Sequence, residues 1–294
     1  MLNKDYYIIY NPISGNGASS MIISRLIEDL KNNLYSFEII KTEFPGHATQ
    51  VCKQIKGPAK IIAVGGDGTF NEVINGAMQN SDRLILGFMP GGTGNAFMHD
   101  LNATTYEKAF SLIIQNKTKK IDIMKLVCNN IMEYSFNIVG WGMASDINSL
   151  AEKLRSFGPA RYTLASIYHV FHKKSRRAKV IIDNQKLSDD FLFILCLNTI
   201  HTGKGMKAAP NAILNDGFID VIILKSSISK LELLLLLPKI FSGKHILSKK
   251  VKYVKAKNLS IIPEKDEKLN IDGEMKQQTP ISIEVLPKQI NVLM

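Results

Sequence analysis

The first 116 residues alternate between short apolar runs and longer segments whose apolar positions recur every three or four residues. Short apolar runs predict buried strands, and the longer pattern predicts amphipathic helices. In and just after the segment 19–33, for example, Leu26, Leu30 and Leu34 recur at four-residue spacing. Regular alternation of the two elements predicts a doubly wound parallel sheet with helices on both faces. The predicted strands are 6–11, 36–42, 60–65 and 84–89, and the predicted helices are 19–33, 47–55, 71–79 and 104–116.

The pattern changes after Lys119, where strand-like runs separated by turn residues dominate. Such runs predict a second, β-rich domain of the sandwich type. We therefore expect an α/β nucleotide domain over 1–118 and a β-rich domain over 119–286, with about 287–294 returning to the first domain. Its predicted strands are 120–128, 133–139, 178–183, 191–198, 218–224, 251–262 and 281–286, with helical insertions near 146–157, 160–172 and 229–242.

Composition narrows the class of protein. A chain of 294 residues is long for one hydrophobic core, which favours two domains. A content of 45% apolar and 21% charged residues is typical of globular proteins. Its three cysteines lie far apart without C-x-x-C spacing, so neither a disulfide framework nor a zinc site is expected. No apolar run approaches the ~20 residues of a membrane-spanning helix, and no long apolar segment resembling a secretion signal opens the chain. We therefore expect a cytoplasmic protein.

The formal net charge of +11 is concentrated in two stretches, 153–179 and 225–257. The second stretch encloses a leucine-rich run from 231 to 237. Lysines around a short apolar segment are typical of a surface that binds anionic membranes, and a buried helix with solvated lysines is the open alternative. Nucleic acid is not expected as a partner, because no zinc-finger, RNA-recognition or recognition-helix pattern accompanies the charge.

Three glycine-rich segments, 11–17, 65–72 and 90–96, begin where predicted strands end. Loops at the carboxyl ends of parallel strands converge on one crevice, and glycines let the backbone come close to a phosphate. Asp67 lies within the second segment, where a carboxylate would repel phosphate directly. The position therefore predicts a metal ligand or a general base, and an aspartate that caps the following helix is the alternative.

The usual signatures of P-loop NTPases, Rossmann dehydrogenases and protein kinases are missing from the sequence. Five motifs in chain order resemble instead the diacylglycerol kinase catalytic domain family, which includes bacterial soluble lipid kinases and the related sphingosine and ceramide kinases. The resemblance extends from the first strand to the last thirty residues. The motifs are Asn11-Pro12-x-Ser14-Gly15, Gly65-Gly66-Asp67-Gly68-Thr69-x-Asn71-Glu72, Pro90-x-Gly92-Thr93-x-Asn95, Asn215-Asp216-Gly217-x-x-Asp220 and Asp272-Gly273-Glu274.

The resemblance implies a kinase that uses ATP and Mg²⁺ to phosphorylate a lipid hydroxyl, with its active site in the cleft between the two domains. By the same resemblance, Glu274 is expected to accept the hydroxyl proton and Asp67 to organise Mg²⁺ and the hydroxyl, although the two roles could be exchanged. The residues expected to contact ATP are Asn11, Pro12, Ser14, Gly15, Thr42, Gly65, Gly66, Asp67, Gly68, Thr69, Asn71, Glu72, Gly92, Thr93 and Asn95.

The resemblance also implies a second Mg²⁺, distinct from the one on ATP, at Asp216. The backbone carbonyls of Ile213 and Phe218 would be its further ligands. Hard oxygen ligands of this type suit Mg²⁺. An ordinary type I turn that opens a strand is the alternative interpretation of this segment.

Several functions remain open. Diacylglycerol or a similar neutral lipid, presented at a membrane surface, is the expected substrate, and a sphingoid base or long-chain alcohol is the alternative. An NAD kinase, which shares the Gly-Gly-Asp-Gly loop, is disfavoured by the motifs at Asp216 and at Asp272 to Glu274. A catalytically silent lipid-binding protein is disfavoured because both candidate acids, Asp67 and Glu274, are present. The sequence does not predict the number of subunits.

Overall fold

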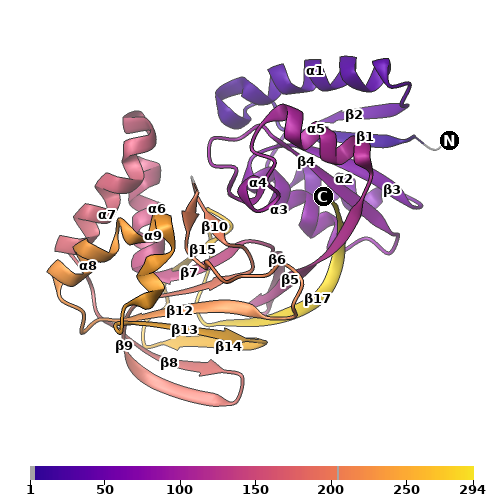
Figure 1. Cartoon of the computed structure of the whole chain (residues 1–294). Coiled ribbons are helices and arrows are strands. Elements are labelled where there is room, and N and C mark those ends of the chain that lie inside the picture. Colours follow the sequence, from indigo (N-terminus) through magenta and orange to yellow (C-terminus); the bar gives the residue numbers. More distant parts are fainter. Residues whose placement is uncertain (1–3, 204) are drawn as a thin grey trace. The chain divides into compact units, whose positions relative to one another are not determined.

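The computed structural model describes residues 4–203 and 205–294, and the chain divides into two compact units. Unit 1 contains the residues up to Ile123 together with Pro287–Met294, and unit 2 contains Met124–Leu286. Figure 1 shows the helices and strands of both. No helix in the described ranges is both long enough and apolar enough to cross a membrane.

A parallel sheet of five strands forms the centre of unit 1, with the order β2-β1-β3-β4-β17. The order reverses between β1 and β3, and sheets of this class bind ligands beyond the carboxyl ends of the strands at such a switch point. The predicted doubly wound sheet is therefore confirmed. Its strands are β1 (Tyr6–Tyr10), β2 (Phe37–Lys41), β3 (Ala59–Gly65), β4 (Leu84–Pro90) and the end of β17 (Ile281–Leu293).

Helices cover both faces of this sheet, with α1 beside α5 on one face and α2 beside α3 on the other (Figure 1). In α1, the buried stripe is Ile23, Leu26 and Leu30. Leu34, which was predicted on the same stripe, is 92% exposed because the helix ends at Asn32. The helices of unit 1 are η1 (Ser14–Gly17), α1 (Ala18–Asn32), α2 (His47–Gln54), α3 (Asp67–Met78), α4 (Ala96–Asp100) and α5 (Tyr106–Gln115).

Unit 2 is built on antiparallel strands, and its longest complete strand is β9 (Gln185–Leu197). The first half of β9 pairs with β8, and its second half pairs with β7 on one side and β12 on the other. One strand therefore takes part in both layers of the sandwich. The other strands are β5 (Thr118–Cys128), β6 (Ile131–Ser135), β7 (Ile138–Gly142), β8 (Arg176–Ile182), β10 (His201–Thr202), β11 (Met206–Lys207), β12 (Ile219–Lys225), β13 (Val251–Ala256), β14 (Asn258–Pro263), β15 (Lys268–Ile271), β16 (Glu274–Gln278) and the start of β17.

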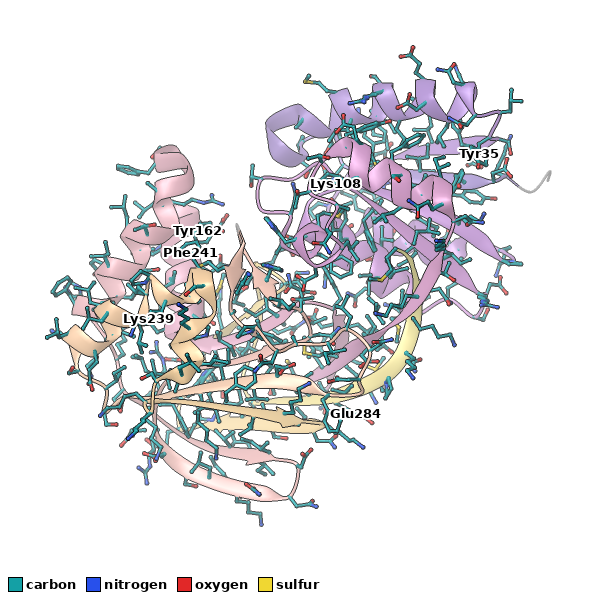
Figure 2. The ribbon with its side chains drawn as sticks, viewed as in Figure 1. Tyr35, Lys108, Tyr162, Lys239, Phe241 and Glu284 are labelled. Atoms are coloured by element: carbon teal, nitrogen blue, oxygen red, sulfur yellow. The ribbon has the colours of Figure 1, made fainter. Side chains whose placement is uncertain are left out.

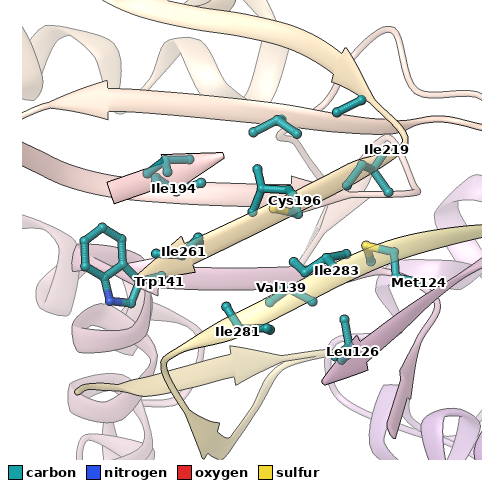
Figure 3. Close-up of a cluster of buried hydrophobic side chains, with 14 of the residues drawn as sticks. Met124, Leu126, Val139, Trp141, Ile194, Cys196, Ile219, Ile261, Ile281 and Ile283 are labelled. Atoms are coloured by element: carbon teal, nitrogen blue, oxygen red, sulfur yellow. The ribbon is translucent and has the colours of Figure 1, made fainter. Parts of the chain in front are cut away.

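The layers of unit 2 enclose a large apolar core, which Figure 3 shows in close-up, and two smaller apolar clusters lie beside it. Trp141, Ile194 and Cys196 are fully buried in it, together with Ile261 and Ile281 from the other strands. Alternate residues along each strand face this core, which is the pattern expected of a sandwich. The predicted β-rich domain is therefore confirmed.

Two predicted strands of unit 2 are each divided in the structure. The run 133–139 becomes β6 and β7, and the run 251–262 becomes β13 and β14, with Lys257 between them. The helices of unit 2 are α6 (Met143–Lys153), η2 (Arg155–Ala160), α7 (Arg161–Phe171), α8 (Lys230–Leu236), α9 (Lys239–Ser242) and η3 (Lys244–Leu247).

Candidate active site

The three glycine-rich segments of unit 1 meet beyond the ends of β1, β3 and β4. A Cβ atom placed on Gly15 would lie 2.3 Å from the carbonyl oxygen of Gly91, and one on Gly92 would lie 2.4 Å from the Cα of Gly66. The Gly91 amide also donates a hydrogen bond to the carbonyl of Gly65 at 2.7 Å. Backbone packs directly on backbone here, which only glycine permits. The fifteen residues predicted to contact ATP all belong to unit 1.

Helix α3 begins at Asp67, four residues earlier than predicted. Gly68, Thr69 and Asn71 therefore belong to its first turns rather than to a loop, and the side chain of Thr69 lies against Gly65. The first amide groups of a helix have no partner within the helix and carry a partial positive charge. The switch point thus places a helix N-terminus, which is a favourable position for phosphate, at the glycine-rich segments.

The Asp67 carboxylate connects the β3–α3 turn to the start of α4. Its oxygens accept hydrogen bonds from the backbone amides of Ala96 at 3.0 Å and Phe97 at 3.3 Å. Asp67 therefore caps a helix, but that helix is α4 rather than the helix in which Asp67 itself lies. These hydrogen bonds fix the Asp67 carboxylate beside the glycine-rich segments.

Several other residues predicted to contact ATP form hydrogen bonds that stabilise the loops at the carboxyl ends of the strands. Asn95 adopts a φ of 48°, and its side-chain amide exchanges hydrogen bonds with the backbone amide and carbonyl of Gly92 at 2.9 and 2.8 Å. The Asn11 side chain accepts from the amide of Ile13 at 3.1 Å, and the amide of Thr42 donates to the carbonyl of Tyr10 at 2.9 Å. Of the others, Thr93 is exposed, while Pro12, Ser14 and Gly68 are half-buried.

Glu72 points its carboxylate at a different helix. It accepts hydrogen bonds from the amides of Gly46 at 2.8 Å and Ala48 at 3.1 Å, at the start of α2. These bonds fix α2 to α3, so the ATP contact expected for Glu72 stays a prediction.

In unit 2, the Asp272-Gly273-Glu274 turn separates two acids with different surroundings. Asp272 is only 2% exposed, and its carboxylate accepts four hydrogen bonds of 2.7–3.2 Å from the segment 135–138. The chain wraps around this carboxylate, which is why the predicted strand 133–139 is divided. The donors are the hydroxyl of Ser135 and the amides of Phe136, Asn137 and Ile138.

We expect Asp272→Asn to lower the free energy of unfolding of unit 2 by about 2–3 kcal/mol, because the new NH₂ group cannot accept from a buried amide. Fluorescence during urea unfolding is a suitable measurement, since the single tryptophan, Trp141, is buried in this unit. Asp266→Asn, at an exposed position, is the matched control and should change stability by less than about 0.5 kcal/mol. Equal effects of the two substitutions would contradict the structural role of Asp272.

Glu274 is the first residue of β16, and its side chain is 51% exposed. Its carboxylate forms an ion pair of 2.8 Å with the ammonium of Lys276. Burial alone would lower the pKa of Lys276, but the charges of Glu274, Glu133 and Asp272 raise the pKa above its usual value. Burial also raises the pKa of the nearby Glu133 carboxyl. The motif analysis missed Lys276 and Glu133, although the two-residue spacing from Glu274 to Lys276 indicates one face of a strand.

Both oxygens of the Asp216 carboxylate have partners other than a metal. One accepts from the amide of Phe218 at 3.1 Å, and the other forms an ion pair with Lys255. The ammonium of Lys257 lies 5.4 Å from the centre of the Phe218 ring, so two positive charges stand at this turn. Mg²⁺ at Asp216 would have to displace Lys255, so the carboxylate as it stands does not fit a metal site. The carbonyl contacts of Ile213 and Phe218 stay predictions.

Strand pairing explains the position of Lys255. The lysine stands directly opposite Asp220 in the β12–β13 register, close to Asp216 at the start of the turn. Asp220 is buried, burial raises the pKa of its carboxyl, and one of its oxygens accepts from the hydroxyl of Tyr253 at 2.6 Å. Lys255 is therefore the counter-charge for two carboxylates.

We expect Lys255→Met to lower the free energy of unfolding by about 1–2 kcal/mol, because it removes the lysine that forms an ion pair with Asp216 and stands opposite Asp220. Millimolar MgCl₂ should restore part of the lost stability in the variant and change the wild type little. Thermal unfolding in EDTA and in MgCl₂ measures both effects, with Lys252→Met on the same strand as control. A wild-type Tm that rises strongly with MgCl₂, and no longer does so in Asp216→Asn, would show that a metal already displaces Lys255.

Comparison with known proteins agrees with this architecture. The family model described as diacylglycerol kinase catalytic domain matches residues 5–126. The model described as YegS C-terminal NAD kinase beta sandwich-like domain matches residues 137–294. Together the two matches include most of both units.

Relatives and solved structures extend the agreement over the whole length. A diacylglycerol kinase of Staphylococcus haemolyticus is 31% identical over 99% of this chain and 88% of its own, and one of Bacillus subtilis is 29% identical over 98% and 95%. A solved structure of a candidate diacylglycerol kinase from Bacillus anthracis superposes with a TM-score of 0.82 at 25% identity, covering 100% and 98% of the two chains. The chain therefore belongs to the diacylglycerol kinase catalytic domain family, a family of lipid kinases.

A more distant neighbour shares only the fold. The crystal structure of an NAD kinase from Archaeoglobus fulgidus in complex with ATP has a TM-score of 0.50 at 13% identity, covering 98% of this chain and 93% of that one. This agreement concerns architecture and does not extend to the substrate.

Proposed function

We propose that this protein transfers the γ-phosphoryl group of ATP, in a Mg²⁺-dependent reaction, to a hydroxyl group of diacylglycerol or a similar neutral lipid. The observation that carries the proposal is that relatives named diacylglycerol kinase match 98–99% of the chain. The glycine-rich segments at the switch point of unit 1 support it, since they offer a backbone surface of the kind that holds phosphates.

In unit 1, the first amides of α3 and the packed backbone at Gly15, Gly66 and Gly92 would hold the phosphates of ATP. Asn95 and Asn11 would keep the flanking loops in shape through the hydrogen bonds described above. Mg²⁺, when bound with ATP, neutralises charge on the phosphates. Asp67 is the carboxylate beside these segments, so it would hold that ion and orient the lipid hydroxyl.

In unit 2, Glu274 would act as the general base. The hydroxyl proton would pass to the Glu274 carboxylate as the hydroxyl oxygen bonds to the γ-phosphorus, and the bond from that phosphorus to the bridging oxygen would break and release ADP. The position of its side chain supports this role, because Glu274 is half-exposed at the start of β16 and is accessible to a substrate hydroxyl. The roles of Glu274 and Asp67 are separable by experiment.

We propose further that the enzyme works in the cytoplasm and meets its lipid at a membrane surface. The three cysteines support a reducing compartment, since all are buried and none is paired. A long-chain lipid has negligible concentration in water, so a kinase that acts on it has to approach a bilayer or a micelle.

Phosphorylation of a lipid panel in mixed micelles tests the proposed function. The panel contains diacylglycerol, monoacylglycerol, sphingosine, ceramide and polyprenol, with NAD as an unrelated acceptor. We expect a Mg²⁺-dependent product from diacylglycerol. Transfer to sphingosine alone would change the substrate class, transfer to NAD alone would contradict the lipid-kinase function, and ATP binding without transfer to any acceptor would indicate a binding protein.

A further inference from the structure

The helices of unit 2 carry an apolar surface that faces outward. In α7, the apolar residues Leu164, Ile167, Tyr168 and Phe171 occupy positions i, i+3, i+4 and i+7, and all four are exposed. A stripe with this spacing normally faces the core of a protein. The core-facing positions of α7 are instead Ala165 and Val170, so α7 is apolar on two sides and only one of them is covered.

The neighbouring helices repeat this arrangement. In α8, Leu233 and Leu236 are buried, while Leu231, Leu234 and Leu235 are exposed. Helix α7 packs against α8, and α8 against α9 (Figure 1). Helix α9 also packs against η3, so the outer residues of all four belong to neighbouring elements. We call the following residues the outer apolar face, whose exposed fractions run from 37% to 77%: Leu164, Ile167, Tyr168, Phe171, Leu231, Leu234, Leu235, Phe241 and Leu247.

Basic residues outnumber acids in the two sequence segments that carry this face. Residues 161–174 include three basic residues and no acid. Residues 229–250 include five lysines and one glutamate, which gives a formal charge of 5 − 1 = +4. The side chains of Lys174, Lys230, Lys239, Lys244 and Lys249 are exposed, and Figure 2 labels Lys239 and Phe241 as a basic and an apolar member of this surface.

The basic surface is narrower than the lysine-rich sequence from 225 to 257. Lys225 forms an ion pair with Asp189, and Lys255 forms one with Asp216, so these lysines neutralise acids of unit 2. Lys173 donates hydrogen bonds to the carbonyls of Ser226 and Ile228, which fixes the end of α7 to the segment before α8. The two helical segments are therefore held together as one platform.

We propose that the outer apolar face, with its surrounding lysines, is the surface through which this protein lies on an anionic bilayer. Helix α7 is about 16 Å long, about half of the ~30 Å hydrocarbon thickness, so it would lie along the interface rather than cross it. Leucines and aromatic residues beside lysines are the composition of such interfacial helices. This inference rests on the proposed function for its biological purpose and on the exposed residues for its location.

Co-sedimentation of the full chain with vesicles tests the inference. We expect binding to vesicles of phosphatidylglycerol and phosphatidylcholine, weak binding to phosphatidylcholine alone, and loss of affinity at high salt. The double substitution Leu231→Gln/Leu235→Gln should lower the partition coefficient at least about tenfold, since it removes two inserted side chains. Lys239→Glu/Lys244→Glu should lower binding to anionic vesicles only.

A matched control comes from unit 1. Met21 and Leu34 are exposed apolar residues outside the face, at 79% and 92%. Met21→Gln/Leu34→Gln should leave vesicle binding unchanged. Equal binding by wild type and Leu231→Gln/Leu235→Gln would overturn the inference. A wild-type dimer in ultracentrifugation that this double variant converts to a monomer would also overturn it, because a second copy would then cover the face.

Activity separates this inference from the proposed function. With diacylglycerol dispersed in detergent micelles, the face variants should retain phosphorylation, because the acceptor no longer has to be extracted from a bilayer. Vesicle binding without phosphorylation of any acceptor would contradict the kinase function and leave the membrane face supported. Phosphorylation in micelles with no vesicle binding by the wild type would support the kinase function and contradict the membrane face.

Discussion

Glu274→Gln is expected to lower kcat for lipid phosphorylation by about 10²- to 10⁴-fold, which is the usual contribution of a positioned general base. The substitution preserves shape and removes the proton-accepting charge. Because Glu274 is half-exposed at the start of β16, folding and ATP affinity should be little changed. Initial rates in mixed micelles and ATP titration by calorimetry measure the two quantities separately.

Glu284→Gln is the matched control for this prediction. Glu284 also lies in unit 2, is 53% exposed and forms an ion pair with a lysine, Lys125, at 3.4 Å (Figure 2). Its substitution should leave kcat within about twofold of wild type, because loss of an exposed pair changes stability by only about 0–1 kcal/mol. If Asp67→Asn abolished transfer and Glu274→Gln did not, Asp67 rather than Glu274 would be the base.

Gly92→Ala is expected to weaken ATP binding by about 100-fold, because its Cβ would stand 2.4 Å from the Cα of Gly66. The contact joins two backbones, so no flexible side chain can move aside, and the segments after β3 and β4 have to separate. Calorimetric titration with ATP would measure the loss. Since the strain is local, the Tm should fall by only a few degrees.

Gly94→Ala provides the comparison within the same segment. A Cβ there would meet only the Asp67 carboxylate, at 3.3 Å, and the backbone does not need a positive φ. We expect a loss of affinity several-fold or less. Similar losses for both alanine variants would mean that glycine at these positions serves flexibility of the segment and not close packing of the two backbones.

Much of the α/β architecture could be predicted because each strand of unit 1 is a short apolar run and each helix has a clear repeat. The start of α3 could not be predicted, because glycines and an aspartate are typical of a loop. In the structure these residues form the first turn of the helix, and Asp67 is fixed there by a hydrogen bond from the start of α4. Likewise, periodicity placed Leu34 in the core although the helix had already ended.

The surroundings of the candidate site were hidden for a different reason. The ion pair of Lys255 with Asp216 joins residues that lie 39 positions apart in sequence, and the bonds of Asp272 reach residues 134–137 positions away. Such pairs depend on strand order and register, which local patterns do not contain. The motif at Asp216 predicted a bound metal cation. In the structure the cation beside that carboxylate is the ammonium group of Lys255.

The shared strand β17 has a consequence for synthesis of the protein. Ile281–Glu284 pair with β14 in unit 2, whereas Asn291 and Val292 pair with Ile85 and Leu86 of β4. Positions 85 and 291 are 206 residues apart, so a ribosome needs about 10–40 s between making β4 and making its partner. During that time the outer edge of β4 lacks its native partner, and unpaired edges are sites of aggregation. Unit 1 is thus the first to be translated and among the last to be completed.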